Sequence, residues 1–314
     1  MTEKYVIGVD LGGTKIYTAL VDLEGNIIKE NTIKTEAHKG DIEVLNKIMK
    51  TIDSVLENVN LDEVKAIGIG SPGPLDVKKG IIVSSSNLPF ENFNLVKPIK
   101  DKYKLPTFLD NDANAATLAE FMFGSGKGTE NMIFITASTG IGAGAILNGK
   151  IYRGNTSNAL ELGHTIVMKD GPRCGCGNNG CAESLGSGTA IMKKAIEACK
   201  SNVLTSLKEY DEVTAKEVFQ EAAKGDKVSK EILRFCLSYL GITVANAINI
   251  FDPEMVVIGG GVTNGGKIVF DIIEDEVENI CLKAISDNCS IKKAKLEGKA
   301  GVLGAAALAI TESN

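Results

Sequence analysis

The sequence predicts an α/β fold made of two βββαβα-type domains with a cleft between them. An apolar strand pattern at residues 5–10 runs into the glycine-rich turn Gly12-Gly13-Thr14-Lys15, and a hairpin follows. A second apolar run at 131–136 leads into the glycine-rich turn Ser138-Thr139-Gly140 and another hairpin. Because helix and strand patterns follow each hairpin, the two halves resemble an internal repeat. We therefore expect the two hairpins to face each other across the cleft.

The first half begins with a three-stranded meander, because its three strand patterns are separated by short turns such as Glu24-Gly25-Asn26. Apolar residues at the helical period indicate the helices that follow, and short apolar runs indicate the strands between them. The expected elements are strands at 5–10, 16–22 and 27–33, a helix at 42–56, a strand at 64–70, a helix at 95–103, a strand at 107–110 and a helix at 113–123.

The second half is mostly helical after its opening strand and a hairpin that turns at Asn148-Gly149. The later elements are expected as helices at 189–199, 214–224 and 228–250, a strand at 255–258, a helix at 266–284, a strand at 290–296 and a helix at 301–310. The glycine-rich stretch 124–129 has the composition of a linker. We therefore expect a small domain of residues 1–122 plus 301–314 and a large domain of residues 123–300.

The composition predicts a globular protein, with 44% apolar residues, 24% charged residues and a net charge of −6 over 314 residues. This balance argues against nucleic acid as a partner, because phosphate backbones require clustered lysine and arginine. The basic run at 291–295 is short, and we interpret it as a solvated strand edge. With no cationic leader, and with apolar segments interrupted by glycine or charge, we expect a cytoplasmic protein without a membrane partner. Its seven cysteines would there stay reduced.

The glycine-rich turns predict phosphate binding. Glycine lets the backbone approach a phosphate, and successive N–H groups of a tight turn form a concave set of donors. The expected nucleotide-binding residues are Asp10, Gly12, Gly13, Thr14, Lys15, Thr139, Gly140, Gly259, Gly260 and Gly261. Among them, Asp10 is suited to hold Mg²⁺ through water, because hard cations prefer carboxylate oxygens. The alternative is that these segments are ordinary β-turns.

Asp112 lies where a predicted strand stops and a helix begins. One interpretation is structural, with Asp112 as the N-cap of that helix. The other is catalytic, because a carboxylate fixed at a strand end is well placed as the general base that accepts the proton of an attacking hydroxyl. The two roles are compatible. The neighbouring Asn111 offers both a donor and an acceptor, which suits a sugar hydroxyl.

His164, Cys174, Cys176 and Cys181 form a four-ligand set of the kind that closed structural zinc sites use. The alternatives are a hydrogen-bonded core histidine and a redox pair, although the spacing of Cys174 and Cys176 is not the C-x-x-C of thioredoxin-type chemistry. Four protein ligands leave no position for a catalytic water, so the metal would shape the site. Glu161 and Glu183 flank the set, and we interpret them as acceptors for a neutral polyol; the alternative is that they are solvated surface residues.

These motifs resemble the ROK sugar kinases, specifically the bacterial glucokinase-like members, over nearly the whole chain. The histidine and cysteine motifs are highly specific. The residues that carry the resemblance are Asp10-Leu11-Gly12-Gly13-Thr14-Lys15, Ser71-Pro72-Gly73-Pro74-Leu75-Asp76, Asn87-Leu88-Pro89-Phe90, Asp110-Asn111-Asp112-Ala113-Asn114-Ala115, Ser138-Thr139-Gly140-Ile141-Gly142-Ala143-Gly144, Glu161-Leu162-Gly163-His164, the Cys174–Glu183 segment and Ile258-Gly259-Gly260-Gly261.

The resemblance implies the fold of actin, Hsp70 and hexokinase, and the ATP-dependent phosphorylation of the 6-hydroxyl of an aldohexose with Mg²⁺. It implies that Asp112 is the base and that zinc is bound by His164 and the three cysteines. It also implies a homodimer or homotetramer. The residues expected to hold the sugar are Ser71, Asn87, Asn111, Asp112, Glu161, His164 and Glu183.

The segment 154–160 departs from the family's usual glycine-rich approach to its histidine motif, so the preferred sugar stays open. Glucose is the expected acceptor, with mannose, N-acetylmannosamine, fructose and allose as alternatives, and ADP or polyphosphate remain alternative donors. Two other classes of function remain. A sugar-responsive repressor would need a DNA-binding helix-turn-helix, for which a first strand at Tyr5 leaves no room. A non-catalytic sugar sensor would keep the fold and lack turnover.

Overall fold

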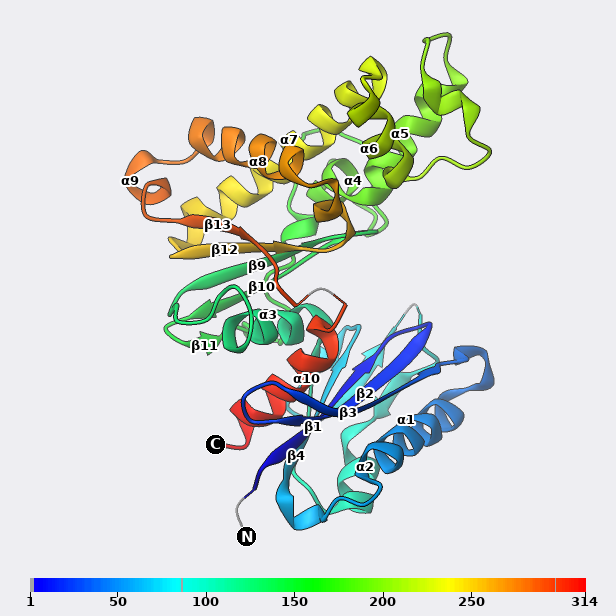
Figure 1. The fold of residues 1–314 in the computed structure, drawn as a ribbon, viewed down its shortest axis with the longest axis vertical. Helices are drawn as coiled ribbons and strands as arrows, with labels where there is room; N and C mark the ends of the chain where they lie inside the picture. Colours follow the sequence, from blue (N-terminus) through cyan, green and yellow to red (C-terminus); the bar gives the residue numbers. More distant parts are fainter. Residues whose placement is uncertain (1–2, 86, 297) are drawn as a thin grey trace. The chain divides into compact units, whose positions relative to one another are not determined.

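The protein is described by a computed structural model that covers residues 3–85, 87–296 and 298–314 (Figure 1). The chain forms two compact units. The first consists of Met1–Thr129, Gly144–Ala159 and Lys295–Asn314, and the second of Glu130–Ala143 and Leu160–Ala294. The described residues also form the 3₁₀ helices η1 (Ala37–Lys39), η2 (Leu61–Glu63), η3 (Leu162–His164), η4 (Ser206–Glu209) and η5 (Gly261–Gly265).

The first unit is built on a five-stranded sheet with the order β3-β2-β1-β4-β8. Its strands are β1 (Tyr5–Leu11), β2 (Lys15–Asp22), β3 (Ile27–Lys34), β4 (Val64–Ser71) and β8 (Thr107–Asn111). The first three pair antiparallel, which confirms the predicted meander, and β1, β4 and β8 pair parallel. The carboxyl ends of three strands therefore meet at one edge of the sheet.

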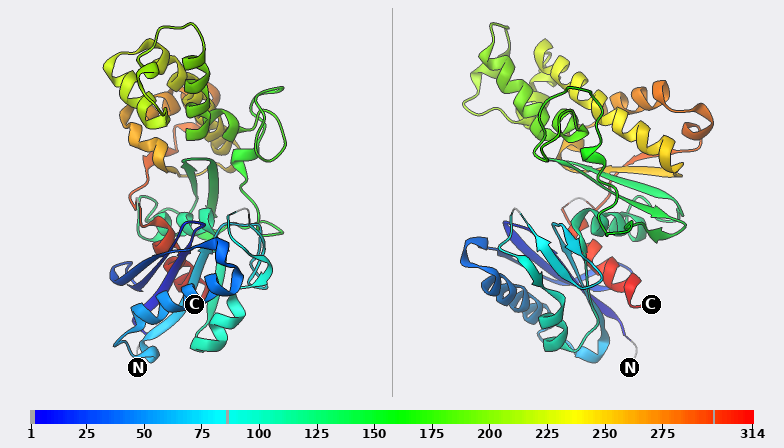
Figure 2. Two further views of the ribbon diagram at one scale, coloured as in Figure 1. Left: turned by 90° about the vertical axis from the view of Figure 1, so that its right-hand side faces the viewer. Right: turned by 180° about the vertical axis from the view of Figure 1, so that it is seen from behind.

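Helices cover both faces of this sheet. Alternate side chains of the strands point to opposite faces, so Ile7 and Ile67 pack with α1 (Asp41–Leu56) and α2 (Val96–Tyr103). Val6 and Ala66 pack on the other face with α3 (Asp112–Met122) and α10 (Ala300–Glu312). In Figures 1 and 2 the red helix α10 lies against the blue β1, its distant neighbour in sequence.

Two glycines allow α10 to approach so closely. A side chain at Gly8 would clash with the carbonyl of Val302, and one at Gly68 with the carbonyl of Ala305. Every residue of α10 from Val302 to Ile310 is buried, so the helix is apolar on all sides and its pattern lacks a distinct apolar stripe.

A separate three-stranded sheet, β5 (Leu75–Asp76), β6 (Ile81–Ser84) and β7 (Glu91–Asn94), was not expected from the sequence. Its strands are two to four residues long, too short to display a strand period.

A second five-stranded sheet has the order β11-β10-β9-β12-β13, and its strands β9, β12 and β13 belong to the second unit. The strands of this sheet are β9 (Met132–Ala137), β10 (Ile141–Leu147), β11 (Lys150–Ile151), β12 (Met255–Gly259) and β13 (Ser290–Lys293). The exposed β13 lies at one edge, as predicted for the basic run, and β10 and β11 are joined by the predicted Asn148-Gly149 turn.

The helices of this unit are α4 (Ala182–Gly186), α5 (Gly188–Lys200), α6 (Ala215–Lys224), α7 (Lys227–Phe251), α8 (Lys267–Ile280) and α9 (Lys283–Ser286). The single helix expected at 266–284 is instead two. Cys281 and Leu282 leave the helical conformation, and the Leu282 amide donates to Oδ1 of Asn249 at 3.1 Å. A contact from α7 therefore competes with the helical continuation.

By length and composition α7 could cross a membrane, yet 61% of its most apolar window is buried inside the protein. Leu237, Leu240 and Val244 are fully buried, and the helix packs against α4, α6 and α8. It is the central core helix of this unit.

Candidate functional site

In the first unit, the parallel strands bring several predicted site residues to one edge of the sheet. Asp10 on β1 is opposite Gly70 on β4, and the next residue along, Ser71, is opposite Asn111 on β8. Asp112 follows directly as the first residue of α3. Asp10, Ser71, Asn111 and Asp112 thus gather at the carboxyl ends of the strands, where open α/β sheets bind ligands.

The first glycine-rich hairpin lies at the end of β1, and the amide of Gly12 donates to the carbonyl of Lys15 at 3.0 Å. Asn87 packs directly on this turn, because a Cβ placed on Gly13 would come within 2.7 Å of the Asn87 Cβ. Thr35 donates its hydroxyl to the Gly12 carbonyl at 2.6 Å and fixes the turn from the other side. Only glycine fits at position 13 without displacing Asn87.

The predicted N-cap of α3 is wrong by one residue. The cap is Asn111, whose Oδ1 accepts from the Ala113 amide at 2.8 Å, and Asp112 is already helical. Strand β8 extends one residue further than its apolar pattern indicates, so the extended Asn111 takes the capping position. The carboxylate of Asp112 also accepts from the Ala113 amide, at 2.8 Å, which orients it.

The environment raises the pKa of both carboxyls at this edge. Desolvation is the main cause for Asp112, although its surface is open to solvent, and the amides of Ala113 and Asp112 oppose it. Desolvation also raises the pKa of Asp10; nearby Lys15 lowers it and the charge of Asp112 raises it further. Two close carboxylates whose charges repel form a site that a divalent cation would stabilise.

Beneath Asp112 lies an ionic network that the sequence did not reveal. Asp110 is fully buried and accepts from the Asn111 amide at 2.7 Å, from Asn114 Nδ2 at 2.9 Å and from Arg153 Nε at 2.6 Å. Arg153 also donates through Nη2 to Glu312 at 2.7 Å, and these carboxylates raise its pKa against the effect of burial. The network joins β8, the start of α3 and α10.

In the second unit, the structure brings together the four predicted metal ligands. The ligand atoms of His164, Cys174, Cys176 and Cys181 all lie within 4.8 Å of one another. His164 Nδ1 is 3.6 Å from Cys174 Sγ, and the sulfurs of Cys176 and Cys181 are 3.6 Å apart. A tetrahedral Zn²⁺ with usual bond lengths requires N to S and S to S separations of about 3.6 and about 3.8 Å.

The sulfur separation of 3.6 Å is far too long for a disulfide, and all three cysteines are free. Burial raises the pKa of the Cys181 thiol to about 12, while the Asn178 amide lowers the pKa of the exposed Cys176. Since zinc binds thiolates, the donor set fits a metal that would displace protons from these thiols.

The two flanking glutamates differ in their contacts. Glu183, in α4, accepts from the amide of Ile141 at 3.1 Å and also lies 3.7 Å from Cys174 Sγ. It therefore links the cysteine loop to the second glycine-rich hairpin. Glu161 is 65% exposed, with Oε2 3.9 Å from His164 Nε2. His164 thus faces the cysteines through one ring nitrogen and Glu161 through the other.

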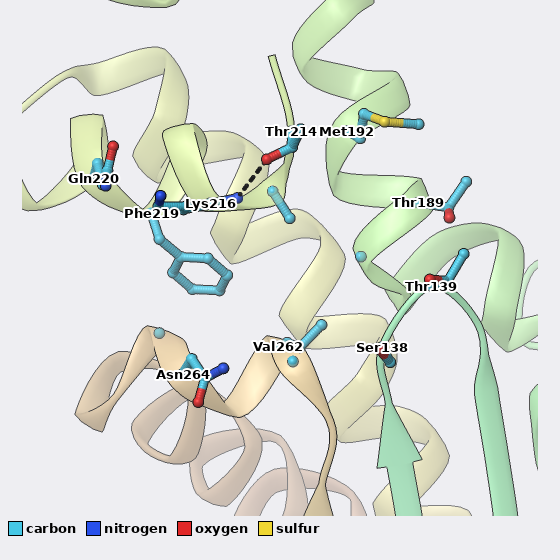
Figure 3. Close-up of a pocket in the computed structure, with 14 residues that line it drawn as sticks. Ser138, Thr139, Thr189, Met192, Thr214, Lys216, Phe219, Gln220, Val262 and Asn264 are labelled. Atoms are coloured by element: carbon cyan, nitrogen blue, oxygen red, sulfur yellow. Dashed lines mark hydrogen bonds between the residues drawn. The ribbon is translucent and has the colours of Figure 1, made fainter. Parts of the chain in front are cut away.

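A pocket of about 710 Å³ opens beside the second glycine-rich hairpin (Figure 3). In Figure 3, Ser138 and Thr139 lie at the hairpin tip, and the ring of Phe219 and the side chain of Asn264 lie across the pocket from them, beyond Val262. The lining residues are Ser138, Thr139, Gly188, Thr189, Met192, Thr214, Ala215, Lys216, Phe219, Gln220, Gly261, Val262, Asn264 and Gly265.

Of the nucleotide-binding residues predicted in this unit, Thr139 and Gly261 line the pocket. Gly140 lines a neighbouring cavity, and Gly260, with φ 88°, packs on the carbonyl of Ala137. The sequence did not identify Phe219 and the other residues that line the pocket, because they come from α5, α6 and η5 and only the fold brings these elements together. The available signal was the capping box at Thr214, whose side chain and that of Glu217 fix the start of α6.

The model of the ROK family matches residues 6–312 of the chain. The chain is 36% identical to a glucokinase of Thermotoga maritima over 98% of both proteins. It is 32% identical to the Escherichia coli DNA-binding transcriptional dual regulator NagC, over 97% of this chain and 75% of that protein.

Among solved structures, a ROK family glucokinase from Streptomyces griseus in complex with glucose and AMPPNP has a TM-score of 0.79. It is 32% identical and covers 97% of this chain and 98% of its own. This similarity confirms the predicted α/β fold, with its two mixed five-stranded sheets, as the hexokinase-like fold of ROK proteins. The chain therefore belongs to the ROK family.

Proposed function

We propose that this protein is an ATP-dependent hexose kinase that phosphorylates the 6-hydroxyl of glucose. The observation that carries the proposal is the oriented carboxylate of Asp112, with its raised pKa, beside Asp10 and the glycine-rich hairpin. The similarity to glucokinases over the full chain, one of them solved with glucose and AMPPNP, supports it.

Asp112 acts as the general base. Its carboxylate accepts the proton of the sugar 6-hydroxyl as that oxygen forms a bond to the γ-phosphorus, while the bond to the β-phosphate oxygen breaks and ADP leaves. Its raised pKa makes it a stronger base than an ordinary aspartate.

Asp10 and the first hairpin serve the phosphates. Asp10 would hold Mg²⁺ through water, and a bound Mg²⁺ neutralises charge on the transferred phosphoryl group. The amides of Gly12 and Gly13, with Thr14 and Lys15, supply donors from the turn. The adenosine would occupy the 710 Å³ pocket of the second unit, where Phe219 offers an aromatic face and Thr139 a hydroxyl.

The sugar hydroxyls would be bound by neutral and acidic acceptors. The proposed residues are Ser71, Asn87 and Asn111 from the first unit and Glu161, His164 and Glu183 from the second. Zinc would be held by His164, Cys174, Cys176 and Cys181, where it cross-links the loop and orients the His164 ring. Because this set fills a tetrahedral site, the metal would have no part in bond making.

Substituting Cys176→Ser is expected to remove stoichiometric zinc and to raise the Kd for glucose about 10- to 100-fold. Cys176 is exposed, so its loss breaks the site while removing little apolar burial. The loss in affinity corresponds to one or two hydrogen bonds that the loop no longer orients. Metal analysis and calorimetry measure both quantities.

The control is Cys199→Ser, a cysteine outside the cluster, which should keep one zinc per chain and unchanged glucose affinity. Wild-type protein that contains no stoichiometric zinc, or a Cys176→Ser variant that binds glucose normally, would contradict the assigned metal role.

The similarity to NagC favours a second candidate, a ROK protein that binds a sugar as a signal and does not phosphorylate it. Such a protein would bind the hexose and release no ADP. Turnover with ATP and the hexose together separates the two functions.

A further inference from the structure

We infer that a cavity of about 320 Å³ in the second unit is an anion site for the phosphate chain of the phosphoryl donor, with Lys193 and Arg173 as its cationic residues. The cavity is lined by Thr139, Gly140, Arg173, Cys174, Gly175, Glu183, Ser184, Ser187, Thr189, Ala190 and Lys193. The inference rests on the proposed function for the identity of the donor.

The position of the cavity is the first argument. It shares Thr139 and Thr189 with the 710 Å³ pocket, so the two spaces adjoin at the tip of the second glycine-rich hairpin. Along α5, Met192 lines the larger pocket and the next residue, Lys193, lines the smaller one. A nucleoside in the larger pocket would therefore extend its phosphates past Thr139 toward Lys193.

The charges are the second argument. Within the part of the chain that the structure describes, neither Arg173 nor Lys193 forms an ion pair or a side-chain hydrogen bond. Both cations are thus free to bind an anion. Lysine acts on phosphate as a point charge, and arginine can bind two phosphate oxygens at once.

The neutral donors are the third argument. The hydroxyls of Thr139 and Thr189 also have no partner among the described residues, and both face this shared boundary. Glu183 is the one carboxylate among the described lining residues, and the Ile141 amide donates to its Oε2 at 3.1 Å. Arg173 and Lys193 carry two positive charges against this single carboxylate, so the charged side chains of the lining have a net positive charge.

The test measures binding and needs no turnover. Calorimetry compares adenosine, ADP, ATP with Mg²⁺, and tripolyphosphate alone for the wild type and for Lys193→Gln, alone and combined with Arg173→Gln. The combined variant should raise the Kd for ATP about 10- to 100-fold and leave the Kd for adenosine unchanged, since each charge-assisted contact contributes about tenfold. The control Lys169→Gln removes an exposed charge that does not line the cavity and should change neither.

The tripolyphosphate arm distinguishes a chain carried by a nucleoside from a free one. Binding of tripolyphosphate to the wild type and its loss in the combined variant would show that a free phosphate chain suffices. If ATP affinity alone falls, the site serves only nucleotide phosphates. Because Arg173 adjoins Cys174, zinc content is measured for each variant, and Lys193→Gln alone, distant from the cysteines in sequence, must show the effect in the same direction.

The inference is overturned if ATP and adenosine weaken equally, or if neither weakens. A protein that binds ATP through Lys193 and never phosphorylates a hexose would refute the proposed function and keep this site. A protein that phosphorylates glucose with an unchanged KM for ATP in the combined variant would refute this site and keep the proposed function.

Discussion

Asp112→Asn should lower kcat for glucose phosphorylation by about 10²- to 10⁴-fold, the usual contribution of a general base. The amide cannot accept the proton of the 6-hydroxyl, whereas its oxygen can keep the hydrogen bond from Ala113 that orients the side chain. The KM for glucose should change much less than kcat. Steady-state kinetics with a coupled ADP assay measure both.

The matched control is Asp101→Asn, an exposed carboxylate on α2 that pairs only with Lys97 in the described structure and should keep full activity. The wild-type kcat/KM should fall at low pH through a pKa above that of an ordinary aspartate, because the environment raises the pKa of Asp112 and protonation removes the base. A fully active Asp112→Asn variant would show that another group takes the proton.

Arg153→Met should lower the free energy of unfolding of the first unit by about 3 kcal/mol or more, because it leaves the fully buried Asp110 carboxylate without its cation. Two hydrogen-bond donors to Asp110 remain, the Asn111 amide and Asn114 Nδ2, and cannot replace the charge. Urea unfolding measures the loss.

The control Arg234→Met removes an exposed arginine on α7 and should change stability by less than about 0.5 kcal/mol. Combining Arg153→Met with Asp110→Asn removes the unpaired charge and should recover part of the stability. Equal stability of Arg153→Met and the wild type would show that solvent reaches Asp110 and that the network does not support the start of α3.

The sequence predicts well those elements whose apolar pattern continues over several residues. Strands β1, β4 and β8 and helix α7 display their patterns over five or more residues, so their positions were expected to within a few residues. Strands β5 to β7 and helix α4 are too short for a period and were missed. The break between α8 and α9 depends on Asn249, a contact from a different helix.

The residues of the candidate site also fall into those that the sequence reveals and those that only the fold reveals. His164 and the three cysteines could be found because they lie close together in the sequence and have a distinctive chemistry. Arg153 forms its ion pair with Asp110 from a segment 43 residues later, and no motif near either residue indicates the pair. It is one of three arginines in the chain, which was the available signal. The walls of the 710 Å³ pocket likewise come from separate helices, so they could be identified only from the fold.

The central claim is phosphoryl transfer to a hexose, and the direct measurement is ADP release by the purified protein across a panel of glucose, mannose, N-acetylmannosamine, fructose and allose. We expect ADP to form only when ATP, Mg²⁺ and a hexose are present together, fastest with glucose, and glucose 6-phosphate to appear in equal amount. Binding of glucose with no ADP above the sugar-free rate for any of these hexoses would contradict the claim and identify a sugar-binding protein without kinase activity.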